Sequence, residues 1–179
     1  MLVINIPSIE KWDEKRSVFV HTKGCSIQLE HSLVSISKWE SRWNQPFLTK
    51  KEKTPEQILD YIKCMSITQN ISDTVYNDIP ANELNKIIDY ISAPMTATVF
   101  SDTKVAGRNE TITSEVIYYW MVTLNIPFEC QKWHLNRLLT LIRVCNIKNQ
   151  PKKKIKTNEL INRNAQLNAA RRQRLNTRG

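Results

Sequence analysis

The sequence predicts a mainly helical α+β fold, with a helical body, a small N-terminal β-hairpin or short sheet, and a basic, helix-capable C-terminal tail. Apolar residues recur at three- and four-residue steps through most of residues 30–147, as on amphipathic helices. All but one of the short segments with strand character lie before residue 30. The charge is equally uneven, because residues 148–179 hold ten bases and one acid, the whole net charge of +9. We therefore expect a globular domain over 1–148 and an interaction tail over 149–179.

The N-terminal region reads as strands followed by a helix. Residues 2–6 form a short apolar segment typical of a strand. Residues 17–20 and 26–29 flank a stretch that contains Gly24, so they predict a hairpin with this glycine at its turn. Over residues 30–44 the apolar period changes to that of a helix, and its expected buried stripe is Leu33, Ile36, Trp39 and Trp43.

Residues 54–57 are the clearest local signal in the chain. The order Thr-Pro-Glu-Gln matches a capping box, in which Thr54 and Gln57 bond each other's backbone and Pro55 takes the first helical position. We expect this helix to run to about Ile67. Its predicted buried stripe is Ile58, Leu59, Ile62 and Met65.

The rest of the body is predicted to be helical with one exception. We expect a turn or short helix at 72–77, a helix at 81–91, an edge strand at 97–100 and a polar loop with Gly107 and Arg108. Two further helices are expected at 113–125 and 127–147. The inward residues expected on these helices are Leu84, Ile87, Ile88, Ile91, Val116, Ile117, Trp120, Met121, Leu124, Leu135, Leu138, Leu139, Leu141, Ile142 and Cys145.

The tail is predicted to be an interaction element. Its helix-capable part, 158–176, has too thin an apolar stripe to fold alone, so we expect it to be disordered or frayed until it docks. It could neutralise phosphates, dock on an acidic protein groove, or act only as a solubilising appendage. The partner-binding residues we expect are Lys152, Lys153, Lys154, Arg163, Leu167, Arg171, Arg172, Arg174 and Arg178.

No catalytic, cofactor or metal site is expected. The three glycines are too far apart to form a phosphate-binding loop. The four cysteines lack the tight spacing of zinc ligands. Cys130 and Cys145 are both expected on the helix at 127–147. His31 and His134 are expected to serve structural roles, as a cap and as a packed imidazole. Asp60 is expected on a solvated helix face. No apolar run has the ~20 residues of a membrane span.

The aromatic residues leave two interpretations open. Trp39, Trp43, Phe47, Trp120 and Trp133 could stack on bases, as in proteins that bind single-stranded nucleic acid. They all lie in the neutral body, however, apart from the basic tail. This separation favours aromatics that pack in the core or face a partner protein.

Several stretches resemble a family encoded in the genomes of tailed bacteriophages. They are residues 26–43 (SIQLEHSLVSISKWESRW), 53–65 (KTPEQILDYIKCM), 125–143 (NIPFECQKWHLNRLLTLIR) and the ending 162–179 (NRNAQLNAARRQRLNTRG). The resemblance spans most of the chain. The family consists of phage structural-module proteins, often called tail assembly chaperones, that act beside the tape-measure protein while the tail is built.

The resemblance implies a non-enzymatic phage tail assembly protein that acts by protein–protein contact, as a chaperone for the tape-measure protein. The alternative is a permanent virion component at the head, neck or baseplate, and a third choice is a nucleic-acid-binding protein with a basic arm. The partners that the resemblance implies are the tape-measure protein or neighbouring virion subunits. A homo-oligomer is compatible with the sequence, and no contact with a membrane is expected. It would act in the host cell cytoplasm during assembly or remain in the virion.

Overall fold

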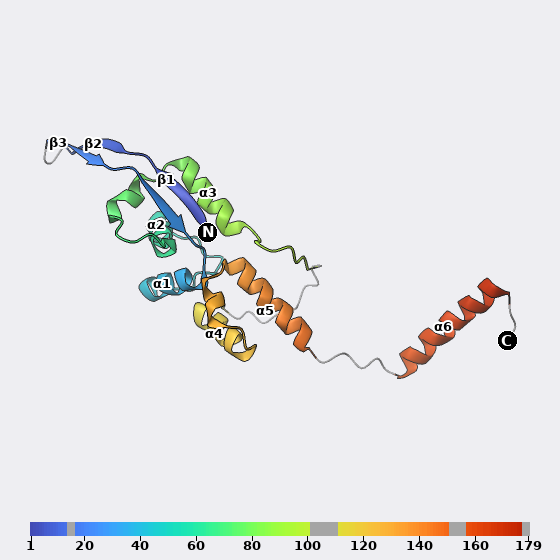
Figure 1. Ribbon diagram of the computed structural model, residues 1–179. Coiled ribbons are helices and arrows are strands. Elements are labelled where there is room, and N and C mark those ends of the chain that lie inside the picture. Colours follow the sequence, from blue (N-terminus) through green and yellow to red (C-terminus); the bar gives the residue numbers. More distant parts are fainter. Residues whose placement is uncertain (14–16, 101–110, 151–156, 177–179) are drawn as a thin grey trace. The chain divides into compact units, whose positions relative to one another are not determined.

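A computed structural model describes residues 1–13, 17–100, 111–150 and 157–176 of the chain (Figure 1). These residues belong to two compact units, Met1–Asn146 and Ile147–Gly179. The first unit contains all the strands and most of the helices, and the second contains one long helix, α6 (Thr157–Leu175). The predicted class, mainly α with a small N-terminal β-hairpin, is confirmed.

The first unit begins with strands and continues with helices. Its strands are β1 (Leu2–Ile6), β2 (Ile9–Asp13), β3 (Val18–Thr22) and β4 (Cys25–Leu29). Its helices, in which η denotes a 3-10 helix, are α1 (Leu33–Trp43), α2 (Pro55–Met65), η1 (Asp73–Asp78), α3 (Ala81–Ser92), α4 (Ser114–Thr123), η2 (Phe128–Lys132) and α5 (Leu135–Asn149).

The four strands form one interrupted antiparallel hairpin, and the predicted turn at Gly24 is wrong. β1 pairs with β4 and β2 with β3 in a continuous register, so the chain reverses between β2 and β3 (Figure 1). Gly24 lies at the interruption between the two pieces. A Cβ atom there would lie 2.9 Å from the backbone nitrogen of Ser8 and 3.1 Å from the carbonyl oxygen of Ile6. The glycine therefore permits a close approach of two backbones.

The sheet contributes one face to the core and extends over a neighbouring segment. Ile4, Ile6, Ile27 and Leu29 are buried at alternate positions, as the period of a strand requires. The end of α2 continues the sheet beyond β4, because the amide of Glu30 donates to the carbonyl of Met65 over 3.0 Å. The C-terminal end of α2 is thus attached to the hairpin by backbone hydrogen bonds.

Helix α1 lies at the centre of the helical body, in contact with α2, α4 and η2. Trp39 is only 1% exposed, and its indole N–H donates to the carbonyl of Gln57 over 2.9 Å. Its ring meets that of Phe47 with 5.1 Å between centroids, and Phe47 in turn packs on Tyr61 at 4.0 Å. Trp39 and Phe47 are therefore core residues and offer no surface for base stacking.

The capping box of α2 is confirmed. The amide of Thr54 donates to Gln57 Oε1 over 3.0 Å, and the amide of Gln57 donates to Thr54 Oγ1 over 3.3 Å. The predicted buried stripe is partly wrong, because Ile58 is 47% exposed while Tyr61 is buried. On α3, Ile88 is likewise exposed and only Ile87 of the predicted stripe is fully buried. Both helices carry more apolar positions than the core accepts.

The predicted helix at 127–147 is confirmed from Leu135 onwards and wrong before it, because an extended residue interrupts the helix. The short helix η2 is followed by an extended residue, Trp133, with ψ of 162°, before α5 begins at Leu135. Cys130 and Cys145 consequently lie on different elements, and all four cysteines are free. The predicted strand at 97–100 is also absent. The loop with Gly107 and Arg108 lies outside the described residues.

A buried carboxylate connects three segments of the body. Glu40 on α1 is 8% exposed. Its Oε1 accepts a hydrogen bond from the amide of Phe47 over 2.7 Å, and its Oε2 accepts one from the amide of Ser114 over 2.8 Å. Ser114 opens α4, where the helix dipole and the unpaired amides favour a negative charge.

We expect Glu40→Ala to lower the free energy of unfolding by about 3 kcal/mol or more, because two charge-assisted hydrogen bonds are lost and two buried amides are left unpaired. Glu40→Gln keeps one acceptor and should cost less. Urea denaturation measures both. Glu52→Ala, at an exposed position, is the matched control and should stay within about 0.5 kcal/mol of the unaltered protein. Equal effects of Glu40→Ala and Glu52→Ala would contradict this role.

Candidate functional site

The basic tail contains α6, on which the structure describes five of the predicted partner-binding residues. Every residue from 161 to 176 is exposed. At about 100° per residue, Arg163, Arg174, Leu167 and Arg171 fall in this order within an arc of about 80°. We call these four residues the arginine stripe. It is about 17 Å long from Arg163 to Arg174, at about 1.5 Å per residue.

The arginine stripe has a leucine among its cations. Leu167 lies between Arg163 and Arg171 in the arc and is 48% exposed. By the same helical geometry Arg172 lies about 180° from Arg163, and Ile161 about 160° from it. The structure therefore brings four of the predicted residues onto one face and places the fifth, Arg172, on the other. Lys152, Lys153, Lys154 and Arg178 lie outside the described residues.

A buried histidine pair lies where the segments before α1 and α5 meet, a feature that the sequence did not predict. Ser32 and His134 form an antiparallel bridge, and the amide of Leu135 donates to the carbonyl of His31 over 2.7 Å. His31 is 2% and His134 6% exposed, and their ring centroids are 5.0 Å apart. We call this arrangement the histidine junction. Its residues are 103 positions apart in sequence (134 minus 31), so no local pattern could reveal it.

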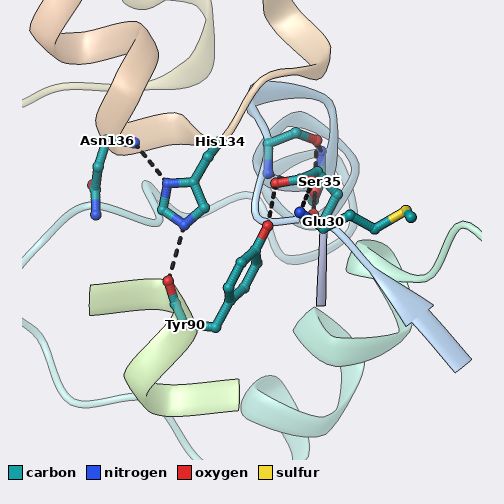
Figure 2. A network of polar contacts seen from close by, with 7 residues as sticks. Glu30, Ser35, Tyr90, His134 and Asn136 are labelled. Carbon is teal, nitrogen blue, oxygen red and sulfur yellow. Dashed lines mark hydrogen bonds and ion pairs between the residues drawn. The ribbon is translucent and has the colours of Figure 1, made fainter. Parts of the chain in front are cut away.

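Hydrogen bonds assign the protonation state of His134 (Figure 2). The amide of Asn136 donates to Nδ1 over 3.3 Å, so this nitrogen carries no proton. The other nitrogen, Nε2, therefore carries the proton and donates to the carbonyl oxygen of Tyr90 over 2.9 Å. A neutral imidazole satisfies both neighbours, whereas a charged imidazolium would direct a second N–H at the amide of Asn136.

The surroundings of the junction keep both histidines neutral. Burial, and secondarily the repulsion that two charged imidazoles would have, lowers the pKa of His31 from 6.5 to about 4. Its Nδ1 shares a hydrogen bond of 2.5 Å with the hydroxyl of Tyr61. Burial likewise lowers the pKa of His134. The packed role predicted for His134 agrees with this geometry. The predicted cap at His31 is wrong, because its ring bonds the side chain of Tyr61 and Ser32 caps α1.

Glu30 continues the network beside the histidines. Its Oε1 accepts a hydrogen bond from the hydroxyl of Tyr90 over 2.7 Å, and its Oε2 lies 2.8 Å from the amino nitrogen of Met1 (Figure 2). Its carbonyl oxygen accepts a hydrogen bond from Ser35 Oγ over 2.8 Å. Burial and the bond to Glu30 raise the pKa of the Tyr90 hydroxyl, which therefore remains a donor at neutral pH. The network connects the first strand, α1, α3 and α5.

A hollow of about 460 Å³ lies beside the start of α1. Lys38 and Lys132 contribute ammonium groups to it, and Cys64 contributes a thiol. Burial raises the pKa of this thiol, so it remains protonated and is a poor nucleophile. The chemistry of the lining suits non-covalent contact. The full lining is Glu30, Ser32, Val34, Ser35, Lys38, Cys64, Met65, Ser66, Ile67, Thr68, Gln69 and Lys132.

A second hollow, of about 290 Å³, is lined by paired charges. Asp60 was predicted to be solvated, and this is wrong. Its Oδ1 accepts a hydrogen bond from Arg42 over 2.6 Å and its Oδ2 one from the indole of Trp43 over 2.9 Å. Lys63 lies 3.6 Å from Asp73 across the same hollow. The charges of these four side chains therefore neutralise one another in two pairs.

Comparisons with known proteins add no relatives. No protein-family model, no curated protein and no solved structure matches the chain. Within the described ranges, no three or more His, Cys, Asp or Glu side chains are placed to share a metal ion. None of the helices in those ranges combines the length and apolar character that crossing a bilayer requires.

The histidine junction makes stability depend on pH. Because the pKa of His31 is about 4 when folded and about 6.5 when unfolded, the unfolded chain binds more protons between these values. The contribution of His31 to stability should therefore be complete above pH ~6.5. The free energy of unfolding should fall by about 3 kcal/mol as the pH drops towards 4. Urea denaturation at several pH values measures it.

His31→Asn is the informative variant for this prediction. An asparagine amide can occupy the position of Nδ1 and bond Tyr61, but it does not titrate in this range. Stability of the variant should decline less between pH 6.5 and 4.5 than that of the unaltered protein. An identical decline would show that the pH dependence arises elsewhere.

Proposed function

We propose that the protein is a non-enzymatic assembly protein of a tailed bacteriophage that acts by protein–protein contact. In this proposal it is a tail assembly chaperone for the tape-measure protein, and the arginine stripe of α6 is its main contact element. It would act in the host cell cytoplasm while the tail is built. The resemblance of residues 26–43, 53–65, 125–143 and 162–179 to phage tail-module proteins supports the phage context.

The observation that carries the proposal is the position of Leu167 among arginines. A leucine 48% exposed between Arg163 and Arg171 can enter an apolar pocket of a protein while the guanidinium groups bond carboxylates at its rim. A polyphosphate surface offers a leucine no such pocket. The stripe therefore fits an acidic protein groove with an apolar floor, which is the helix-in-groove mode of recognition.

The body supports the same interpretation. The histidines are buried and hydrogen-bonded to the protein, and Cys64 is held as a neutral thiol, so these reactive groups are used for structure. The α6 side chains described from 161 onwards contribute nothing to a core, because all of them are exposed. A helix that gains no packing energy within its own chain can gain it from a partner.

A permanent virion component is the alternative within the same proposal. In that case α6 would attach to a neighbouring head, neck or baseplate subunit and stay there. Mass spectrometry of purified virions separates the two roles. Stoichiometric copies in the mature particle indicate a structural subunit, and absence from the particle indicates a chaperone.

The stripe can be tested with two pairs of matched variants in the full chain. Leu167→Ser and Arg171→Gln alter the stripe, whereas Ile161→Ser and Arg172→Gln make the same changes on the other side of α6. We expect each stripe variant to weaken binding to the tape-measure protein of the same virus by about ten-fold, because a buried anchor or a charge-assisted bond is lost. Isothermal calorimetry measures the dissociation constants.

The controls decide whether the face or the bulk charge matters. Ile161→Ser and Arg172→Gln should change affinity by less than about two-fold, since they lie away from the stripe. Equal losses from Arg171→Gln and Arg172→Gln would contradict the stripe and indicate that only net charge is recognised. No binding of the unaltered chain to the tape-measure protein would refute the chaperone role.

Nucleic-acid binding is the second candidate, and the three arginines on one arc favour it. Here the affinity for DNA or RNA should fall log-linearly with salt, with a slope of about 0.9 per phosphate contacted on a duplex. Arg171→Gln should reduce that slope by about one, while Leu167→Ser should leave it unchanged. A loss of protein binding in Leu167→Ser therefore distinguishes the first candidate from the second.

A further inference from the structure

Helix α4 has an apolar outer side that the first unit does not cover. Its inward residues Ser114, Ile117 and Met121 are buried. On the opposite side Tyr119 is 66% and Val122 59% exposed, although both are large apolar residues. Helices that are apolar around their circumference are normally buried on all sides. Tyr119 and Val122 are thus residues of a type usually found in a protein core, yet they lie exposed on the surface.

The apolar side continues from α4 onto η2. The rings of Tyr118 and Phe128 are in contact, with centroids 6.4 Å apart, and Phe128 is 54% exposed. The hydroxyl of Tyr118 donates to Gln131 Oε1 over 2.9 Å, which holds the tyrosine ring in place. We call Tyr118, Tyr119, Val122 and Phe128 the α4 face. Aromatic residues of this kind are enriched in protein interfaces.

The two described charged residues closest in sequence to the α4 face are both acidic. Between residues 111 and 131 the charged residues are Glu115 and Glu129, both exposed and both acidic. Hydrogen bonds, first from the backbone and then from Thr113, lower the pKa of Glu115 and keep it ionised. Of the next described bases along the chain, Lys132 lines the hollow beside the start of α1, and Arg137 lies over the ring of Trp133.

This charge pattern selects the occupant of the α4 face. Nucleic acid would bring phosphates towards Glu115 and Glu129, and the same face of a second copy would bring two more glutamates. A basic partner relieves both conflicts. Side chains at positions 118, 119 and 122 form the three- and four-residue ridges that pack between helices, so a helix is the element that fits them.

We propose that the α4 face binds an amphipathic helix of a partner protein whose apolar stripe is bordered by lysine or arginine. The proposal rests on the proposed function, since it supplies a second contact surface for an assembly partner. It assigns to α4 the opposite charge preference to that of the arginine stripe. The two surfaces therefore recognise different segments, and each can fail separately.

The test uses the full chain and two synthetic helical peptides of about 18 residues. Both have leucines at i, i+3, i+4 and i+7; one has lysines beside this stripe and the other has glutamates at the same positions. We expect the lysine peptide to bind about ten-fold more tightly in fluorescence anisotropy. The net charge of +9 attracts the glutamate peptide, so a preference for lysine cannot come from overall charge.

Matched variants locate the binding. Tyr119→Ser with Val122→Ser should weaken binding of the lysine peptide about ten-fold, whereas Ile88→Ser with Val99→Ser, at other exposed apolar positions, should leave it within about two-fold. Glu115→Gln with Glu129→Gln should abolish the preference between the peptides, and Glu52→Gln with Glu56→Gln should retain it. Thermal unfolding confirms that the variants remain folded.

Three outcomes would overturn the proposal: equal affinity for both peptides, no binding of either, or self-association of the chain that Tyr119→Ser with Val122→Ser abolishes. The last would mean that a second copy covers the face. Failure of the proposed function would look different. Stripe variants of α6 would then leave tape-measure binding unchanged while the α4 face still preferred the lysine peptide.

Discussion

The first unit depends on one backbone crossing, at which residues 31–32 run antiparallel to residues 134–135. Helices α1 and α5 both begin at this point, where the amide of Leu135 donates to the carbonyl of His31. Residue Glu30, just before the crossing, connects it to the end of α2 through its amide and to α3 through its carboxylate. The end of β4, the starts of α1 and α5 and the end of α2 therefore meet at one buried position. Unpaired backbone groups would be costly there.

Histidine suits this place because a neutral imidazole is both donor and acceptor. At position 134 it accepts from the amide of Asn136 and donates to the carbonyl of Tyr90. A leucine would leave the amide of Asn136 without this acceptor and the carbonyl of Tyr90 with the amide of Ala93 alone, and a lysine would bring a charge into a buried site. The consequence of choosing histidine is sensitivity to acid, because protonation removes the acceptor. Stability near neutral pH and loss of stability in acid are two results of one arrangement.

Elements determined by neighbouring residues could be predicted from the sequence, and those determined by distant contacts could not. Thr54 and Gln57 contain the whole chemistry of their capping box, and the core positions of α1 follow from its period. Gly24 looked like a turn residue because glycine is common in turns, but its role depends on the backbone of Ser8 across the hairpin. The break before α5 arises from the pairing of His134 with Ser32. Periodicity alone could not detect a partner 102 residues away (134 minus 32).

The candidate surfaces show the same division between local and spatial information. The excess of arginine in the tail is plain in the sequence, but which arginines share a face with Leu167 requires the helix. The helical period placed residues such as Ile117 and Met121 of α4 inward and assigned no role to Tyr119 and Val122. Only their exposure shows that α4 carries more apolar residues than the core uses. Ile58 and Ile88 show that such an excess also occurs singly, where it has no evident meaning. The α4 face differs from them in being continuous across Tyr118 and Phe128 and bordered by acids of one sign. Continuity and charge, more than exposure itself, therefore distinguish a surface that can recognise a partner from an apolar side chain that the core had no room to bury.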